Sequence, residues 1–435
     1  MSLGNVQRSP GHTLKNSLAL LTHTFRQRPA WQWLIAGLVG VTLGVFTLGL
    51  PYFPSRWAPL FVLGVLCLFV TMIAGSARRL LLAIIILDIP LGLDINFAYR
   101  PDAAELDAIG GFSLSLTTIC LIVLYALWLA ELLARKRLPD YSRVWNGTTL
   151  ALTAFVVITM LSVVVARDFM LSIYEIALLV QTLLLYIYVV ATVRTRQDVL
   201  FVVTVLLAGL LLESIIMIGL RFVGHSVRIG GIWARIDHGT RVGGTVGSPN
   251  AAASYLSLSL ALAVGVLLTG LGRSYKWLAL LAFGLGGIAL IFTLSRGGWN
   301  AFVWSMIVLY LLLAWRRSIH SLKSLLLTAG GLLVLVLLFQ DIIGARLFSG
   351  EGSPPQTRLQ MMRLAIKIIK DHPLLGVGAN NFALMIPQYA TPELTGWIKT
   401  VHNKYLLVWA ETGLGGLVTF LLFLLTTIRR GWHAW

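Results

Sequence analysis

Charged side chains are scarce in this sequence. Only 12% of its 435 residues are Asp, Glu, Lys or Arg, whereas 57% are hydrophobic. A soluble domain would hold about twice that charged fraction. Apolar runs of about 20 residues recur along the chain, and each is long enough to cross a bilayer as a self-satisfied helix. The composition therefore predicts an all-α, polytopic membrane protein.

Acidic residues and cysteines are scarcer still. There are 17 Asp and Glu against 34 Lys and Arg, which gives a net charge of +17. In a membrane protein, such an excess reflects basic cytoplasmic loops and contact with membrane lipids. Because no nucleic-acid-binding motif accompanies it, no nucleic-acid partner is expected. The two cysteines, Cys67 and Cys120, both lie in apolar spans, so neither a disulfide framework nor a thiolate metal site is predicted.

Several familiar catalytic motifs are also absent. The sequence has no Walker A motif, no Asp-x-Asp and no HExxH. It also lacks the carboxylate or imidazole clusters that a divalent metal would need. We therefore expect no metal and no cofactor.

Twelve spans are predicted, and together they form one membrane domain over residues 1–435. The third contains Asp88, Pro90 and Asp94 and is expected to be a broken or partly re-entrant helix. Basic turns follow every second span, which places both termini in the cytoplasm. The spans lie near residues 31–50, 57–76, 79–97, 113–134, 148–166, 169–192, 198–220, 250–271, 276–294, 298–315, 323–340 and 403–427.

Two loops on the opposite, outer side break this charge pattern. Loop 221–249 is basic and rich in glycine, and loop 341–402 is long and basic. Basic residues on the outer side favour an anionic partner, although contact with lipid headgroups would also explain them. Within the second loop, residues 356–370 read as an amphipathic helix that could lie in the membrane interface. Its predicted apolar face holds Leu359, Met362, Ile366 and Ile369.

Three residues at the outer ends of spans are candidates for chemistry. Arg241 precedes a Gly-rich turn where the backbone could approach an anion, but that turn could equally be a helix start capped by Asn250. Arg296 is costly at membrane depth unless it has a function or reaches the interface. His402 could transfer a proton or could cap a helix. Glu411, nine residues on, falls on the opposite helix face and is expected to have a structural role.

Three segments together resemble the bacterial O-antigen ligase/polymerase superfamily. The first is G-G-T-V-G-S-P-N with Arg241 ahead of it, and the second is L-S-R-G-G-W-N around Arg296. The third runs from T-R-L-Q-M-M-R to D-H-P-L-L-G-V-G-A-N-N-F and is followed by H-N, nine residues and G-L-G-G. The spacing of His402, Gly413 and Gly416 is similar to that of O-antigen ligases.

The resemblance implies an inverting, metal-independent glycosyltransferase at the periplasmic face of the bacterial inner membrane. Its donor would be a glycan on undecaprenyl diphosphate, and its acceptor a sugar hydroxyl of lipid A–core. Arg241 and Arg296 would bind the diphosphate as its charge develops, and His402 would be the general base. Further substrate-binding candidates are Arg221, Arg235, Asn250, Arg358, Arg363 and Asn403.

Two other readings remain open. The same donor chemistry would serve a polysaccharide polymerase or a protein O-oligosaccharyltransferase, which differ only in the acceptor. A lipid or polysaccharide transporter is also compatible with twelve spans. Against a transporter, the sequence has no paired internal halves and no matched broken helices.

Overall fold

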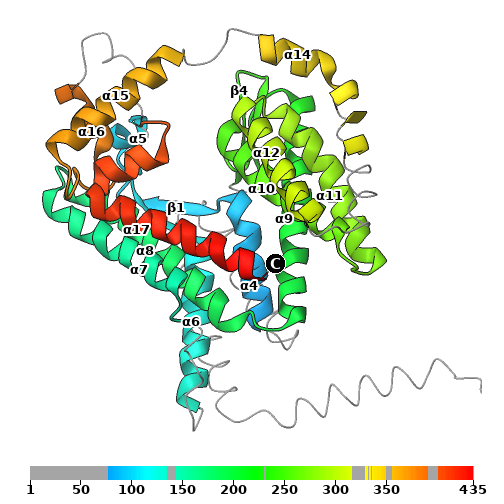
Figure 1. The fold of residues 1–435 in the computed structure, drawn as a ribbon, viewed down its shortest axis with the longest axis horizontal. Coiled ribbons are helices and arrows are strands. Elements are labelled where there is room, and N and C mark those ends of the chain that lie inside the picture. The colour runs from blue at the N-terminus through cyan, green and yellow to red at the C-terminus, as the bar shows by residue number, and fades with distance from the viewer. Residues whose placement is uncertain are drawn as a thin grey trace, which may run out of the picture. The chain divides into compact units, whose positions relative to one another are not determined.

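The computed structural model describes most of the chain beyond residue 76, and helices dominate it (Figure 1). The predicted spans at 31–50 and 57–76 lie outside the described residues, and the span at 323–340 lies partly outside them. The described ranges are 77–106, 108–134, 144–229, 232–315, 329–331, 333–334, 336–348, 355–389 and 400–434.

The described helices follow the predicted spans closely from residue 113 to residue 315. Eight of them are long and apolar enough to cross a membrane, and nine are if one bent pair counts as a span. Twelve spans in the whole chain remain a prediction. The helices are α4 (Ala77–Leu91), α5 (Pro101–Glu105), α6 (Leu116–Ala134), α7 (Gly147–Leu161), α8 (Phe169–Thr192), α9 (Arg196–Val223), α10 (Pro249–Leu268), α11 (Arg273–Phe292), α12 (Arg296–Trp315), α14 (Gln340–Phe348), α15 (Pro355–Asp371), α16 (Phe382–Tyr389) and α17 (Lys404–Ala434), with a 3-10 turn η3 (Ser162–Val165).

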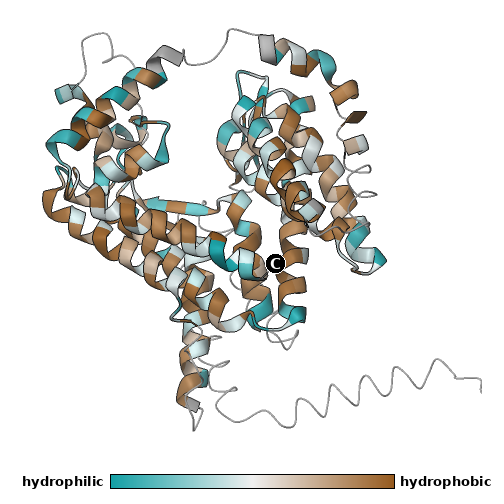
Figure 2. Cartoon of the chain, in the orientation of Figure 1, coloured by the Kyte–Doolittle hydropathy of each residue, from teal (hydrophilic) through white to brown (hydrophobic). Residues whose placement is uncertain are grey.

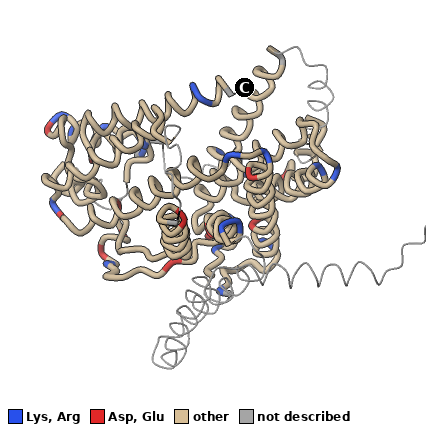
Figure 3. Tube along the Cα trace, turned by 90° about the horizontal axis from the view of Figure 1, so that it is seen from below, with Lys and Arg blue, Asp and Glu red and all other residues tan. Residues whose placement is uncertain are grey.

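Polarity follows the expected pattern for membrane helices. Hydrophobic residues run along the long helices (Figure 2), and Lys, Arg, Asp and Glu gather mainly at helix ends and in the connecting segments (Figure 3). Local sequence signals set several of these ends. Asn146, Asp168 and Thr195 each accept backbone N–H bonds as the N-caps of α7, α8 and α9.

The third predicted span is short, as its polar residues suggested. α4 ends at Leu91, just after Pro90. Asp88 is buried and accepts hydrogen bonds from the backbone N–H of Leu93 (3.1 Å) and of Thr117 (2.9 Å). The chain then leaves the helix as a strand, so the helix predicted to reach residue 97 stops six residues earlier.

Two small antiparallel sheets correct the all-α prediction. β1 (Asp94–Phe97) pairs with β2 (Phe112–Ser115), and β4 (Ile232–Asp237) pairs with both β3 (Val227–Ile229) and β5 (Arg241–Gly244). The strands have three to six residues, and glycines interrupt the second sheet. Strands this short carry too little alternation to stand out from a loop in the sequence.

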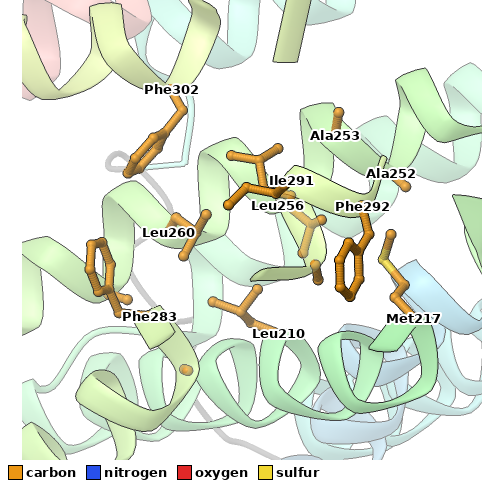
Figure 4. Packing of buried hydrophobic residues seen from close by; sticks show 14 of the residues in the cluster. Leu210, Met217, Ala252, Ala253, Leu256, Leu260, Phe283, Ile291, Phe292 and Phe302 are labelled. Carbon is orange, nitrogen blue, oxygen red and sulfur yellow. The ribbon is translucent and has the colours of Figure 1, made fainter. Parts of the chain in front are cut away.

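The larger described core joins α9, α10, α11 and α12. Leu210 of α9, Leu256 and Leu260 of α10 and Phe292 of α11 belong to one buried cluster (Figure 4). Strands β4 and β5 add Ile236 and other apolar side chains to this cluster. The second sheet is therefore attached rigidly to the ends of these helices.

A kink in α17 creates the second important packing arrangement. Gly413 has φ +70° within the helix, which frees backbone carbonyls that would otherwise bond within it. The Ala410 carbonyl accepts from Val377 N–H (2.9 Å), and the Glu411 carbonyl accepts from Gly378 N–H (3.0 Å). Gly413 thus allows the segment before α16 to bond into the kink.

We predict that Gly413→Ala strongly destabilises the protein. An added Cβ would collide with the Leu374 carbonyl, and the positive φ is strained for alanine. A loss of about 1–3 kcal/mol is expected in thermal unfolding of the detergent-solubilised protein. The matched control is Gly431→Ala in the same helix, where a Cβ meets nothing within 4 Å. Equal melting temperatures for the two variants would contradict the account of the kink.

Candidate functional site

The turn between α11 and α12 is the centre of the candidate site. α11 ends at Phe292 with Thr293 as its C-cap, and α12 begins at Arg296. Leu294 lies between them with φ +50°, an unusual conformation for this residue. The Thr293 hydroxyl accepts a hydrogen bond from Ser295 N–H (3.2 Å) and stabilises the turn. Residues 293–296 therefore form a fixed turn whose first two carbonyls accept bonds from arginine side chains.

Arg241, at the start of β5, is held to this turn at two points. Its Nε donates to the Thr293 carbonyl (3.3 Å), and its Nη2 donates to Asn250 Oδ1 (3.0 Å). The same Asn250 oxygen accepts from the Ser295 hydroxyl (3.0 Å). Asn250 thus links the strand, the start of α10 and the α11–α12 turn through one side chain.

The helix cap at this position is Ser248. Its hydroxyl accepts from Ala251 N–H (3.2 Å), and Pro249 takes the first helical position of α10. The alternative reading of Asn250 as the cap is therefore wrong. Its amide oxygen is instead used to position Arg241.

Three more arginines approach the same turn, and with Arg241 they form what we call the arginine cluster: Arg221, Arg241, Arg296 and Arg346. The Arg221 guanidinium lies over the Phe292 ring, 5.9 Å from its centroid. Arg346 of α14 donates through Nε to the Leu294 carbonyl (3.1 Å). Arg296 is the first residue of α12 and is exposed. Three helices and one strand thus each contribute one arginine at this turn or at the end of α11 beside it.

The electrostatics of Arg241 reflect this crowding. Partial burial lowers the pKa of its guanidinium, and the positive charge of Arg346 lowers it further, while Asp237 opposes both effects. Like charges are therefore close enough to interact. A bound anion would relieve this repulsion.

A buried carboxylate fixes the strand that carries Arg241. Glu213 of α9 is fully buried, and its Oε1 accepts from Thr245 N–H (2.9 Å). The Thr245 hydroxyl also donates to the Pro90 carbonyl (2.7 Å). Gly244 has φ +61° beside this carboxylate, where a Cβ would collide with it. The Gly-rich sequence after Arg241 is therefore needed to bring β5 against α9.

His402 belongs to a different group of helices. It is exposed and lies two residues before the start of α17. The neighbouring Asn403 caps α17, because its Oδ1 accepts from Tyr405 N–H (3.1 Å) and Leu406 N–H (3.2 Å). On the other side, Val401 is buried with residues of α15 and α16. His402 is thus an exposed side chain on a well-anchored backbone.

The helix predicted at 356–370 is present as α15. Leu359 and Ile366 of its predicted apolar face are exposed, whereas Ile369 is buried. Contact of the predicted face with the membrane interface remains a prediction. α15 packs with residues of α16 and α17 through a second apolar side. Arg358 and Arg363 are exposed on it. The buried residues are Met361, Leu364, Ala365, Ile368 and Ile369.

Two adjacent asparagines join this group to neighbouring loops. Asn380 accepts from Ile109 N–H (2.9 Å) and donates to the Leu171 carbonyl (3.0 Å). Asn381, which is fully buried, accepts from Asp168 N–H (2.7 Å) and donates to the Ser172 hydroxyl (2.9 Å). The N-N pair of the third sequence segment therefore holds three loops together near α16.

The structure thus brings some predicted residues together and leaves others apart. Arg221, Arg241 and Asn250 contact residues 292–295, next to Arg296, whereas Arg235 is exposed on β4. His402 and Asn403 lie with the helices of the α15–α17 group. Convergence of His402 with the arginine cluster remains a prediction. Arg346 was overlooked because, in the sequence, it is one of several basic residues in a long loop.

Comparison with known proteins adds an independent observation. Residues 278–421 match the family model described as O-antigen ligase. This match supports membership of the O-antigen ligase superfamily. No curated protein and no solved structure gives a significant match.

The O-antigen ligase match has an informative extent. It includes the α11–α12 turn, Arg346, α15 and His402, and it ends within α17. Arg221 and Arg241 precede it in the sequence, yet Arg221 contacts Phe292 at the end of α11 and Arg241 contacts the turn, both inside the matched region. The cluster therefore joins the matched segment to the sheet that comes before it.

We predict that Asp168 stabilises the loops around α16 in a pH-dependent way. Partial burial tends to raise the pKa of Asp168, but its bonds to Arg100 and to the N–H groups of Leu171 and Met170 lower the pKa overall, below 3.8. Because the pKa of Asp168 is lower in the folded state, its ionised carboxylate stabilises the protein at pH values above the unfolded-state pKa. This stabilisation is lost as the pH falls through the folded-state pKa.

The measurement is the melting temperature of the wild type and of Asp168→Asn from about pH 6 to about pH 3. Asparagine keeps the N-cap of α8 but cannot ionise. The advantage of the wild type is expected to shrink as the pH falls below about 4. A difference that stays constant over this range would contradict the ionic role of Asp168.

Proposed function

We propose that this protein is a periplasmic-face glycosyltransferase of the O-antigen ligase type, which transfers a glycan from undecaprenyl diphosphate to a sugar hydroxyl of lipid A–core. The arginine cluster is the observation that carries this proposal. Arginine binds phosphate oxygens through charge-assisted, often bidentate hydrogen bonds. Several guanidiniums fixed at one turn suit a ligand with several negative charges better than a single headgroup phosphate.

The proposed reaction is a displacement at the anomeric carbon of the donor. The acceptor oxygen forms the new glycosidic bond as the bond from the anomeric carbon to the phosphate oxygen breaks. The electron pair leaves with the diphosphate, whose developing charge is stabilised by Arg241 and Arg296. The acceptor proton goes to His402, and attack from the face opposite the leaving group inverts the anomeric centre.

This assignment requires His402 to approach the arginine cluster when donor and acceptor are bound. His402 is exposed and its backbone is anchored by Val401 and the Asn403 cap, which suits a residue that meets a substrate from solvent or the membrane interface. Asn403 has a capping role in the structure, so a direct contact between Asn403 and substrate is a separate part of the proposal.

The acceptor is the point at which related functions diverge. A polysaccharide polymerase would use a second lipid-linked repeat, and a protein O-oligosaccharyltransferase would use a protein hydroxyl. The purified protein should therefore be given one lipid-linked donor with each acceptor in turn, with and without EDTA. Transfer to lipid A–core that persists in EDTA is expected. Transfer only to another acceptor would contradict the proposed acceptor, and movement of an unaltered glycan would contradict a glycosyltransferase. Loss of transfer with EDTA would contradict a metal-independent reaction.

We predict that His402→Ala lowers the turnover number by about 10²–10⁴-fold, the usual contribution of a general base. The melting temperature should change little, because the side chain is exposed. His372→Ala is the matched control, since His372 is also exposed and lies in the same long segment. Full transfer by His402→Ala in reconstituted membranes would rule out its role as the base.

A further inference from the structure

α14 packs against the end of α11 through an apolar face. Phe339, Ile342 and Ile343 pack on the buried cluster of α9–α12. The Phe339 ring meets the Phe292 ring edge-on, with centroids 5.6 Å apart. Helix residues three, four and seven apart lie on one face. Arg346 therefore follows on the same face as these three apolar side chains, which directs it toward the α11–α12 turn.

A sharp bend makes this packing possible. The helical segments Ala329–Leu338 and Gln340–Arg346 meet at 78°. Phe339 lies at the bend, immediately before α14, and packs against the cluster. The direction of α14, and hence the position of Arg346, is therefore set by packing at Phe292.

Arg346 and Arg241 are held by neighbouring carbonyls of the same turn. Arg241 Nε donates to the Thr293 carbonyl, and Arg346 Nε donates to the Leu294 carbonyl. Each bond fixes the plane of a guanidinium from its Nε side. Because the two acceptors are consecutive residues in a fixed turn, the two guanidiniums are kept near each other although they come from different loops.

Building on the proposed function, we infer that Arg346 is a further substrate-binding residue, which shares the two phosphates of the donor diphosphate with Arg241. Two guanidiniums placed on adjacent carbonyls can each take the oxygens of one phosphate. A diphosphate can therefore engage both guanidiniums through oxygens of different phosphates. α14 thereby acts as the part of the long loop that completes the diphosphate site.

Among the arginines of the long loop, Arg346 is the best placed to bind the diphosphate. Arg358 and Arg363 were candidates from the sequence, but both are exposed on α15, a helix that packs with α16 and α17. Arg346 contacts the same turn as Arg241. Substitution of Arg346 is therefore expected to weaken diphosphate binding more than substitution of either residue of α15.

The test measures binding of inorganic pyrophosphate and of inorganic phosphate to the purified full-length protein. Arg346→Gln is expected to weaken pyrophosphate binding by about tenfold or more, the loss of one strong charge-assisted contact, and to change phosphate binding much less. Arg228→Gln is the matched control, because Arg228 is an exposed arginine on β3. It should change pyrophosphate binding by less than about twofold.

Two results would overturn the inference. The first is pyrophosphate binding by Arg346→Gln that stays within about twofold of the wild type. The second is an equal loss of pyrophosphate binding in Arg228→Gln, which would indicate a general charge effect. Should Arg346→Gln fail to fold, Arg346→Lys replaces it. Pyrophosphate binding by Arg346→Lys is then expected to weaken several-fold, because lysine cannot bind a phosphate through two parallel N–H groups as a guanidinium does. The proposed function is tested separately with Arg241→Gln. If Arg241→Gln loses glycan transfer while Arg346→Gln keeps pyrophosphate binding, only the role of Arg346 fails.

Discussion

Repulsion between guanidinium groups is the constraint around which the α11–α12 region is built. Arginines from α9, β5, α12 and α14 meet at residues 292–296. Bringing like charges together costs free energy, and a flexible loop would let the guanidiniums move apart. Here the backbone carbonyls of Thr293 and Leu294 accept from two of the side chains, and the Phe292 ring lies against a third. The rest of the local structure keeps these acceptors fixed.

That requirement explains features that otherwise look unrelated. Buried Glu213 accepts from Thr245 just after β5 and holds this strand against α9. Arg241, at the start of β5, is thereby held in place beside the turn. Asn250 joins Arg241 to Ser295 because Ser248 has already capped α10. Each of these groups acts on the position of a guanidinium, and none of them needs to touch a substrate.

The sequence predicted what depends on local pattern and missed what depends on long-range contact. Helices from residue 113 to 315 follow apolar runs, and their positions were correct. The residues of α15 that pack inside the protein could not be predicted, because α16 and α17 decide which side of it is covered. Arg346 could not be distinguished from other loop arginines, since its importance comes from a turn some fifty residues earlier in the chain. Gly413 was singled out by its spacing from His402, but the kink at its φ of +70° depends on long-range bonds to Val377 and Gly378.

The central claim is that the arginine cluster binds the diphosphate of a lipid-linked glycan. The most direct measurement is an experimental structure of the protein in a lipid bilayer with undecaprenyl diphosphate bound. The account predicts phosphate oxygens within hydrogen-bonding distance, about 2.7–2.9 Å, of the guanidiniums of Arg241 and Arg346. A diphosphate bound elsewhere, with an ordinary phospholipid headgroup at residues 293–296, would contradict it.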